Sequence, residues 1–174
     1  IARSLTRPVR IMEVCGTHTM SIFRHGIRSL LPEGITLLCG PGCPVCVTPA
    51  SHIDAFLAAA DRPQVTIATF GDLIRVPGAD RSLAGARAGG ARVEIVYSPI
   101  DALTLAQAEP ERTVVFPAIG FETTAPTIAA TILQAERLGI ENFLIIAAAK
   151  TMPQALEAEL ADPAVSEDRL LWPG

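Results

Sequence analysis

The sequence predicts an α/β fold of the Rossmann-like kind, with parallel strands and helices on both faces of the sheets. Two observations predict it. Along the 174 residues, short runs of aliphatic and β-branched residues alternate with longer stretches whose apolar residues recur with a helical period. The short runs are apolar throughout, as is typical of parallel strands that helices cover on both sides. A hydrophobic fraction of 49% is sufficient for a buried core and excludes a disordered chain.

The expected strands are the short apolar runs, of which VRIMEVC is the first and FLIIA lies in the last. Val, Ile and Thr, which favour extended backbone, recur in them. The expected strands are residues 9–15, 35–39, 65–70, 93–97, 113–119 and 142–147.

Segments with helical periodicity lie between and after these strands. The expected helices are residues 19–31, 51–61, 82–88, 101–109, 126–138 and 154–160. The first of them places its large apolar residues on one helical face, namely Phe23, Ile27, Leu30 and Leu31. The second has a marked start, because Ser51 and Asp54 have the spacing of a capping box.

A weak internal repeat suggests two related α/β units. GTHT at residues 16–19 and GFET at residues 120–123 each follow an expected strand and open a helix that leads to another strand and a proline-bearing loop. We therefore expect a first α/β domain at residues 1–112. The second domain is expected to begin in residues 113–174 and to be incomplete, so that the chain is part of a longer protein.

Charge and hydropathy exclude two classes of partner. The formal net charge is −4 and no basic block is present, which argues against nucleic acid. The longest apolar run, residues 143–149, is far shorter than the ~20 residues that a membrane span needs. No signal peptide is recognisable, so the expected location is the cytoplasm, where cysteines stay reduced unless they have a chemical role.

The residues with chemical potential follow the expected strands directly. Cys15 and Cys39 end the first two strands, and Asp72 follows the third. Functional loops of a parallel sheet leave the carboxyl ends of its strands. We therefore expect all four thiols, His18 and Asp72 to share one edge of one sheet.

Cys43 and Cys46 form a C-x-x-C pair whose sulfurs can meet in a disulfide or on one metal ion. A redox dithiol is the better supported reading, although the pair does not open a helix as it does in thioredoxins. A zinc ribbon would need a second C-x-x-C, which is absent. A mixed site of Cys15, His18, Cys43 and Cys46 stays open as an alternative.

The other candidates are ambiguous from local sequence. Cys15 with His18 suits a nucleophile and base or two metal ligands, but a buried strand-end cysteine is an equal alternative. Asp72 can bind a ligand, orient His18, cap a helix or pair with Arg75. Glu122 lies at an expected helix N-terminus, where any carboxylate is stabilised.

Four motifs together make a resemblance to a known family. They are MEVCGTHT at residues 12–19, GPGCPVC at 40–46, FGDLIRVPG at 70–78 and GFETTAP at 120–126. In this order and spacing they closely resemble the HypD family of [NiFe]-hydrogenase maturation factors, over essentially the whole chain.

The resemblance implies a scaffold rather than a conventional enzyme. On it an iron atom receives its cyanide and carbonyl ligands, giving the Fe(CN)₂CO group of the hydrogenase. Cys15 matches the family cysteine that holds the iron together with a cysteine of the chaperone HypC, and His18 matches a neighbouring functional histidine. Cys43 and Cys46 match a redox-active pair.

Asp72 and Glu122 match motif carboxylates whose roles are less settled. Cyanide comes from the partner HypE. The family also carries a [4Fe–4S] cluster on cysteines of its C-terminal region, so the ligands of that cluster are expected outside these 174 residues. Cys39 stands where the family pattern suggests a small residue such as serine. Two alternatives remain: a stand-alone thiol–disulfide oxidoreductase using Cys43 and Cys46, and a structural zinc-binding α/β domain.

Overall fold

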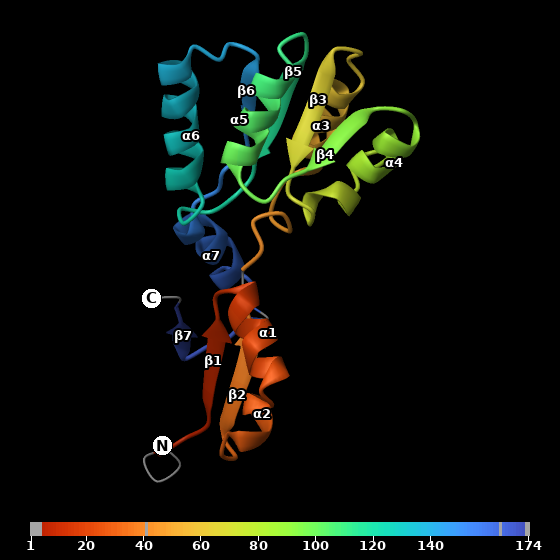
Figure 1. Cartoon of the computed structure of the whole chain (residues 1–174). Coiled ribbons are helices and arrows are strands. Elements are labelled where there is room, and N and C mark those ends of the chain that lie inside the picture. The colour runs from red at the N-terminus through yellow and green to blue at the C-terminus, as the bar shows by residue number, and fades with distance from the viewer. Residues whose placement is uncertain (1–4, 41, 164, 173–174) are drawn as a thin grey trace. The chain divides into compact units, whose positions relative to one another are not determined.

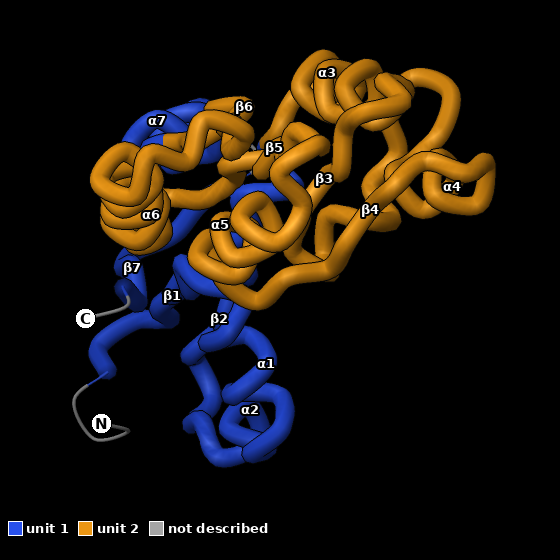
Figure 2. The backbone as a smooth tube through the Cα atoms, turned by 45° about the horizontal axis from the view of Figure 1, so that its top comes forward, with its two compact units in different colours: residues 1–47, 151–174 blue, residues 48–150 orange. Residues whose placement is uncertain are grey.

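The computed structural model describes residues 5–40, 42–163 and 165–172, which form helices and parallel strands throughout (Figure 1). Its contacts divide the chain into two compact units (Figure 2). Unit 1 comprises residues 1–47 and 151–174, and unit 2 comprises residues 48–150. Both units contain parallel strands and helices, which confirms the predicted α/β class.

Unit 1 is built on a three-stranded parallel sheet in the order β2-β1-β7. Its strands are β1 (Val9–Glu13), β2 (Ile35–Cys39) and β7 (Arg169–Leu171). Its helices are α1 (Gly16–Arg24), α2 (Ile27–Leu30) and α7 (Met152–Leu160). Figure 1 shows β7, near the end of the chain, beside β1, near its beginning. Unit 1 is therefore closed by two distant parts of the sequence.

The expected helix at residues 19–31 is two helices. Gly26 has φ 60°, a left-handed conformation that glycine adopts without strain, and this separates α1 from α2. The apolar residues that would share one face of a continuous helix are redirected by this break. Phe23 is 80% exposed and Leu30 is 77% exposed, so the apolar face predicted from the periodicity is open to solvent.

Unit 2 is built on a four-stranded parallel sheet in the order β4-β3-β5-β6. Its strands are β3 (Val65–Thr69), β4 (Arg92–Ile95), β5 (Thr113–Ala118) and β6 (Phe143–Ala147). Its helices are α3 (Ala50–Ala60), the short 3-10 helix η2 (Leu73–Arg75), α4 (Leu83–Ala88), α5 (Pro99–Ala108) and α6 (Ala125–Leu138). Helices α3 and α5 lie on opposite faces of this sheet (Figures 1 and 2). The crossovers thus cover both faces, as a parallel sheet requires.

The core of unit 2 lies between β5 and the helices α5 and α6. Phe116 on β5 is fully buried, and its ring meets that of Phe70 edge-on at a centroid distance of 5.4 Å. Helix α5 begins sharply, because Ser98 and Asp101 form a capping box and Pro99 occupies the first turn. All five residues of β3 are buried. Unit 2 therefore has the packing expected of a stable domain.

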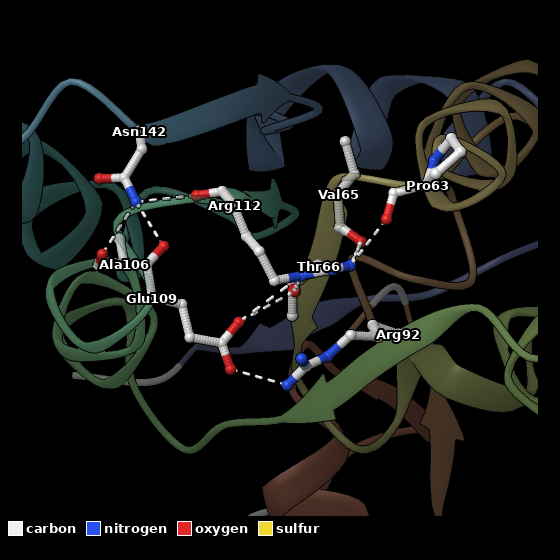
Figure 3. A network of polar contacts seen from close by, with 8 residues as sticks. All are labelled: Pro63, Val65, Thr66, Arg92, Ala106, Glu109, Arg112 and Asn142. Atoms are coloured by element: carbon white, nitrogen blue, oxygen red, sulfur yellow. Dashed lines mark hydrogen bonds and ion pairs between the residues drawn. The ribbon is translucent and has the colours of Figure 1, made fainter.

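A polar network closes the amino ends of the strands in unit 2 (Figure 3). Arg112 donates to Thr66 Oγ1 at 3.1 Å and to two main-chain carbonyls that precede or begin β3. Asn142 donates to three main-chain carbonyls, including that of Arg112 at 2.8 Å. Glu109 pairs with Arg92 at 2.7 Å. These contacts join helix ends to strand starts. They lie at the amino ends of the strands, opposite the loops that carry Asp72 and Glu122.

Asp54 does not act as the predicted capping-box residue. Helix α3 begins at Ala50, and its N-cap Pro49 has no side-chain cap. Asp54 Oδ1 instead accepts the N–H of Ala79 at 2.8 Å, and so holds the loop after η2 against α3. A Cβ on Gly78 would overlap this carboxylate and lie 2.9 Å from Leu57. A larger residue at Gly78 would therefore displace the side chain of Asp54 or Leu57.

The structure corrects the expectation that one sheet edge carries all the candidate residues. Strands β1 and β2 belong to the unit 1 sheet, whereas β3, which precedes Asp72, pairs with β4 and β5. Local periodicity marks strands but does not determine which strands pair. The division by contacts also differs from the expected boundary between residues 112 and 113, because β3–β5 pairing joins segments on both sides of it.

Within the part of the chain that the structure describes, no helix combines the length and hydrophobicity that crossing a bilayer requires.

Candidate functional site

The loops that follow β1 and β2 meet through their main chains. Because the two strands pair in parallel with Glu13 opposite Cys39, their carboxyl ends coincide. A Cβ on Gly42 would lie 2.5 Å from Gly16 N and 2.8 Å from Cys15 Cα. Only glycine permits this approach. The expectation that the Cys15 loop and the C-x-x-C loop gather at one rim is confirmed for these two loops, while Pro41 of the second loop lies outside the described residues.

The C-x-x-C pair lines a cavity of about 300 Å³ within unit 1. Its walls are Gly16, Gly40, Gly42, Cys43, Cys46, Val47 and Glu159. Cys43 is half-buried and Cys46 is exposed, and neither is in a disulfide. The N–H of Cys46 donates to the carbonyl of Cys43 at 3.1 Å, so the pair lies in a turn before α3. The dithiol is therefore open to a reacting partner.

Cys15 occupies the N-cap position of α1 with an extended backbone. Burial by itself raises the pKa of this thiol, but hydrogen bonds from the main chain of His18 and Thr17 and from the Thr17 side chain outweigh it and lower the pKa. The N-terminus of a helix also favours a negative charge. Cys15 is thus predisposed to be a thiolate, the form that binds metals.

Unsatisfied buried polarity concentrates around Cys15. Among the residues that the structure describes, the buried side-chain nitrogen and oxygen atoms without a hydrogen-bond partner are Glu13 Oε2 and His18 Nδ1. Most buried polar groups have partners, and each exception calls for a reason. Both atoms flank Cys15 in sequence, two residues before it and three after it. A group bound beside Cys15 could therefore form hydrogen bonds with Glu13 Oε2 and His18 Nδ1 without breaking existing ones.

Glu13 is a residue that the sequence reasoning missed. Its side chain is fully buried, and Oε1 accepts from Cys39 Sγ at 3.3 Å. Arg28 approaches the same oxygen at 3.7 Å and Cys39 Sγ at 3.8 Å. The thiol of Cys39, at the end of β2, is therefore hydrogen-bonded to a buried carboxylate. A serine, expected here from the family pattern, carries a hydroxyl that could donate the same bond.

Asp72 and Glu122 belong to unit 2, whereas Cys15, His18 and the dithiol belong to unit 1. Each follows a strand of the unit 2 sheet, Asp72 after β3 and Glu122 after β5, and both side chains are exposed. The predicted alternative of an Asp72–Arg75 ion pair does not occur among the described ion pairs. Gly120, two residues before Glu122, is fixed by packing, because a Cβ there would lie 2.5 Å from Thr124 Cβ.

A Lys–His pair at the carboxyl end of β6 was also missed. Lys150 is the single lysine of the chain, and its Nζ lies 3.3 Å from His52 Nδ1. The main-chain N–H of Lys150 donates to the Gly120 carbonyl. His52 is in the first turn of α3. A periodicity argument places His52 on a helix face but does not reveal a partner that follows another strand.

The described residues include no group of three or more His, Cys, Asp or Glu side chains placed to hold a metal ion. Cys15, His18, Cys43 and Cys46 all lie in the described part of the chain, so they do not form the mixed site considered from the sequence.

Comparisons with known proteins decide the family. The family model "HypD: Hydrogenase formation hypA family" matches residues 1–174. The chain belongs to the HypD family.

Among curated relatives, hydrogenase maturation factor HypD of Rhodobacter capsulatus is 48% identical over 174 residues, which are 100% of this chain and 46% of that protein. The Escherichia coli K12 protein of the same name is 50% identical over 168 residues, 97% of this chain and 45% of its own length. The Azotobacter vinelandii protein is 52% identical over 158 residues, 90% of this chain and 42% of its own. The chain thus spans just under half the length of these HypD relatives.

Proposed function

We propose that this HypD chain acts in the maturation of [NiFe]-hydrogenase, as part of a cytoplasmic scaffold on which iron receives its cyanide and carbonyl ligands. The observation that carries the proposal is the main-chain contact between the Cys15 loop and the dithiol loop at Gly42. This contact joins the main chain of Cys15, whose thiol has a lowered pKa, to the loop that carries Cys43 and Cys46, the proposed redox pair. Relatives named as hydrogenase maturation factors support it.

Cys15 is the proposed iron ligand. Cyanide and carbonyl favour low-spin Fe(II), for which a soft thiolate is a suitable protein donor. The chain itself gathers no second and third ligand around Cys15 within its described residues. From the resemblance to the HypD family, we assign the other protein ligand to a partner, a cysteine of a HypC-type chaperone. His18 Nδ1 has no partner in the structure and, as an N–H, could donate to a cyanide ligand of the iron, while Glu13 Oε2 could accept from a donor of the partner.

Cys43 and Cys46 are the proposed electron source. Closing one disulfide releases two electrons and two protons, which a reduction at the iron precursor consumes. The cavity beside them is lined by Gly16, the residue after the proposed iron ligand. Electron donor and iron ligand thus share one rim.

Asp72 and Glu122 are proposed to act with a second partner, a HypE-type cyanide donor. Both are exposed carboxylates that follow neighbouring strands of unit 2. The resemblance to the HypD family implies a [4Fe–4S] cluster in the full-length protein, and its ligands are proposed to lie outside these 174 residues.

The test is infrared spectroscopy of the full-length protein purified with its HypC-type partner. The wild-type complex should show cyanide and carbonyl stretching bands, and Cys15→Ala should lose them together with the bound iron. Cys39→Ser is the matched control, because it removes a thiol of the same unit but keeps a donor for Glu13, and it should retain the bands. Bands that persist in Cys15→Ala would overturn the iron-ligand assignment.

The same proteins separate the alternatives. A stand-alone oxidoreductase built on Cys43 and Cys46 would reduce disulfides equally well without Cys15, and no iron bands would be seen in wild type. A structural zinc domain would retain one zinc per chain that Cys43→Ser releases.

A further inference from the structure

The dithiol cavity contains one carboxylate. Of the residues that line it, Cys43, Cys46 and Glu159 carry groups that exchange protons, and the others are Val47 and three glycines. Oxidation of a dithiol releases protons, which a glycine or valine side chain cannot accept. Glu159 is therefore the side chain of this lining able to take a proton from a thiol.

The sequence of α7 turns Glu159 toward the interior of unit 1. Its half-buried residues are Met152, Ala155, Leu156 and Glu159, while the rest of the helix is exposed. This is the i, i+3, i+4, i+7 pattern of one helical face. Glu159 is the last position of an otherwise apolar stripe. A carboxylate at such a position loses some of its hydration. This loss costs free energy unless hydrogen bonds or opposite charges compensate it.

The electrostatic surroundings of Glu159 favour its protonated form more than those of an ordinary glutamate. Burial raises the pKa of Glu159, and the negative charge of Glu167 raises it further. Glu167 is the charged group that acts on it, and the thiols of Cys43 and Cys46 are the other titratable groups in the lining of the cavity. A proton acceptor works best when its pKa lies close to the working pH.

We propose that Glu159 is the proton acceptor of the Cys43–Cys46 dithiol. The inference rests on the proposed redox role of that pair and deepens it. Cys43 is half-buried, whereas Cys46 is exposed, so the proton of Cys43 has the poorer access to water. Cys43 is thus the thiol that needs a protein group to receive its proton.

The reaction balances with a disulfide, RSSR, as oxidant. The Cys46 thiolate attacks one sulfur of RSSR, which forms a mixed disulfide and releases RS⁻; this RS⁻ takes up the proton lost by Cys46. Cys43 then attacks the Cys46 sulfur while its proton passes to the Glu159 carboxylate, and a second RS⁻ leaves. Glu159 returns that proton to the second RS⁻. The sum is one protein disulfide and two RSH.

The experiment follows disulfide formation in the full-length protein with glutathione disulfide as oxidant between pH 5 and 9. Residue-resolved mass spectrometry after acid quench and alkylation reports the Cys43–Cys46 disulfide separately from other cysteines. Between pH 6 and 7.5, Glu159→Gln should slow its formation by about 10- to 100-fold, because general-base assistance is lost. Near pH 9, where thiols ionise without help, the two proteins should converge.

Two further variants sharpen the result. Glu157→Gln is the matched control, since Glu157 lies on the exposed side of the same helix, and it should follow wild type at every pH. Glu167→Gln removes the neighbouring negative charge and lowers the pKa of Glu159. The acid limb of its pH–rate profile should therefore move to lower pH. A residue with only a packing role would give neither effect.

Equal pH–rate profiles for wild type and Glu159→Gln, or the same slowing in Glu157→Gln, would overturn the inference and leave the redox role of the dithiol intact. A wild-type protein in which glutathione disulfide never yields the Cys43–Cys46 disulfide would overturn that redox role itself, and the inference with it.

Discussion

The two units of the chain differ in how fully their strands and helices are buried. In unit 2 the central strand β3 is buried at every residue, and β5 at all but its first. In unit 1 the edge strand β7 is exposed throughout, and neither α2 nor α7 contains a buried residue. Yet unit 1 contains all four thiols. The thiols thus lie in the more sparsely packed unit, where Cys39 and Cys46 are exposed.

The largest expected effect breaks the packed unit. Phe116→Ala removes a fully buried ring from the core of unit 2, and large-to-small changes of this kind cost about 3–5 kcal/mol of unfolding free energy. Denaturant unfolding monitored by circular dichroism measures it. Phe23→Ala is the counterpart in unit 1, where the ring is 80% exposed, and should cost less than about 0.5 kcal/mol. Similar losses for the two variants would contradict the contrast between the units.

A smaller but more local effect is expected at the junction of the two thiol loops. Gly42→Ala places a methyl group 2.5 Å from Gly16 N and must push the loops apart. The alkylation rates of Cys15 and Cys43 with iodoacetamide should change several-fold, while unit 2 keeps its unfolding transition. Gly85→Ala is the control, because a Cβ there meets nothing nearer than 3.6 Å and alanine favours the helix. Unchanged alkylation in Gly42→Ala would show that the loops do not depend on their close approach.

The smallest effect concerns the pairing of distant segments in unit 1. Asp168 Oδ2 accepts the N–H of Arg10 at 2.8 Å and pairs with Arg7, and the hydrogen bond and these charges lower the pKa of Asp168. A lowered pKa in the folded state stabilises the fold above the ordinary aspartate value of about 4 and ceases to do so as the pH falls through the folded value.

Asp168→Asn should therefore lower the melting temperature slightly at pH 7, and the difference from wild type should shrink as the solution is acidified below about pH 4. Thermal melts at several pH values measure this. Asp162→Asn serves as a comparison for an acidic residue of the same segment outside β7. A difference that grows on acidification would mean that the charge of Asp168 does not contribute in this way.

Much of the secondary structure could be predicted from the sequence, because each strand and most helices have their own local signal. Residues 35–39 are a strand as expected, and the Ser98-Pro99 start of α5 lies close to its predicted helix. The meeting of the Cys15 and C-x-x-C loops also followed, since parallel strands that are neighbours along the chain end at one edge.

What could not be predicted depends on contacts between distant residues. That Asp72 follows a strand of a different sheet is decided by strand pairing, which local periodicity does not encode. Glu159 lines the dithiol cavity from a helix more than a hundred residues away in sequence, so nothing near Cys43 announces it. Glu13 looks like one residue of an apolar strand, and only its burial against Cys39 and Arg28 shows its place. Phe23 is exposed although it belongs to the apolar helical pattern, and that pattern does not mark the break at Gly26 either.

The pairing of β1 with β7 has a consequence for the order in which the protein folds during its synthesis. A ribosome releases the chain from its amino end, so β3 to β6 and their helices are all synthesised before β7 appears. Unit 2 can finish folding while β1 still lacks one of its two neighbours. The cavity lined by Cys43, Cys46 and Glu159 is consequently among the last parts of these 174 residues to be completed. It acquires its final form only after unit 2, which interrupts unit 1 in the sequence.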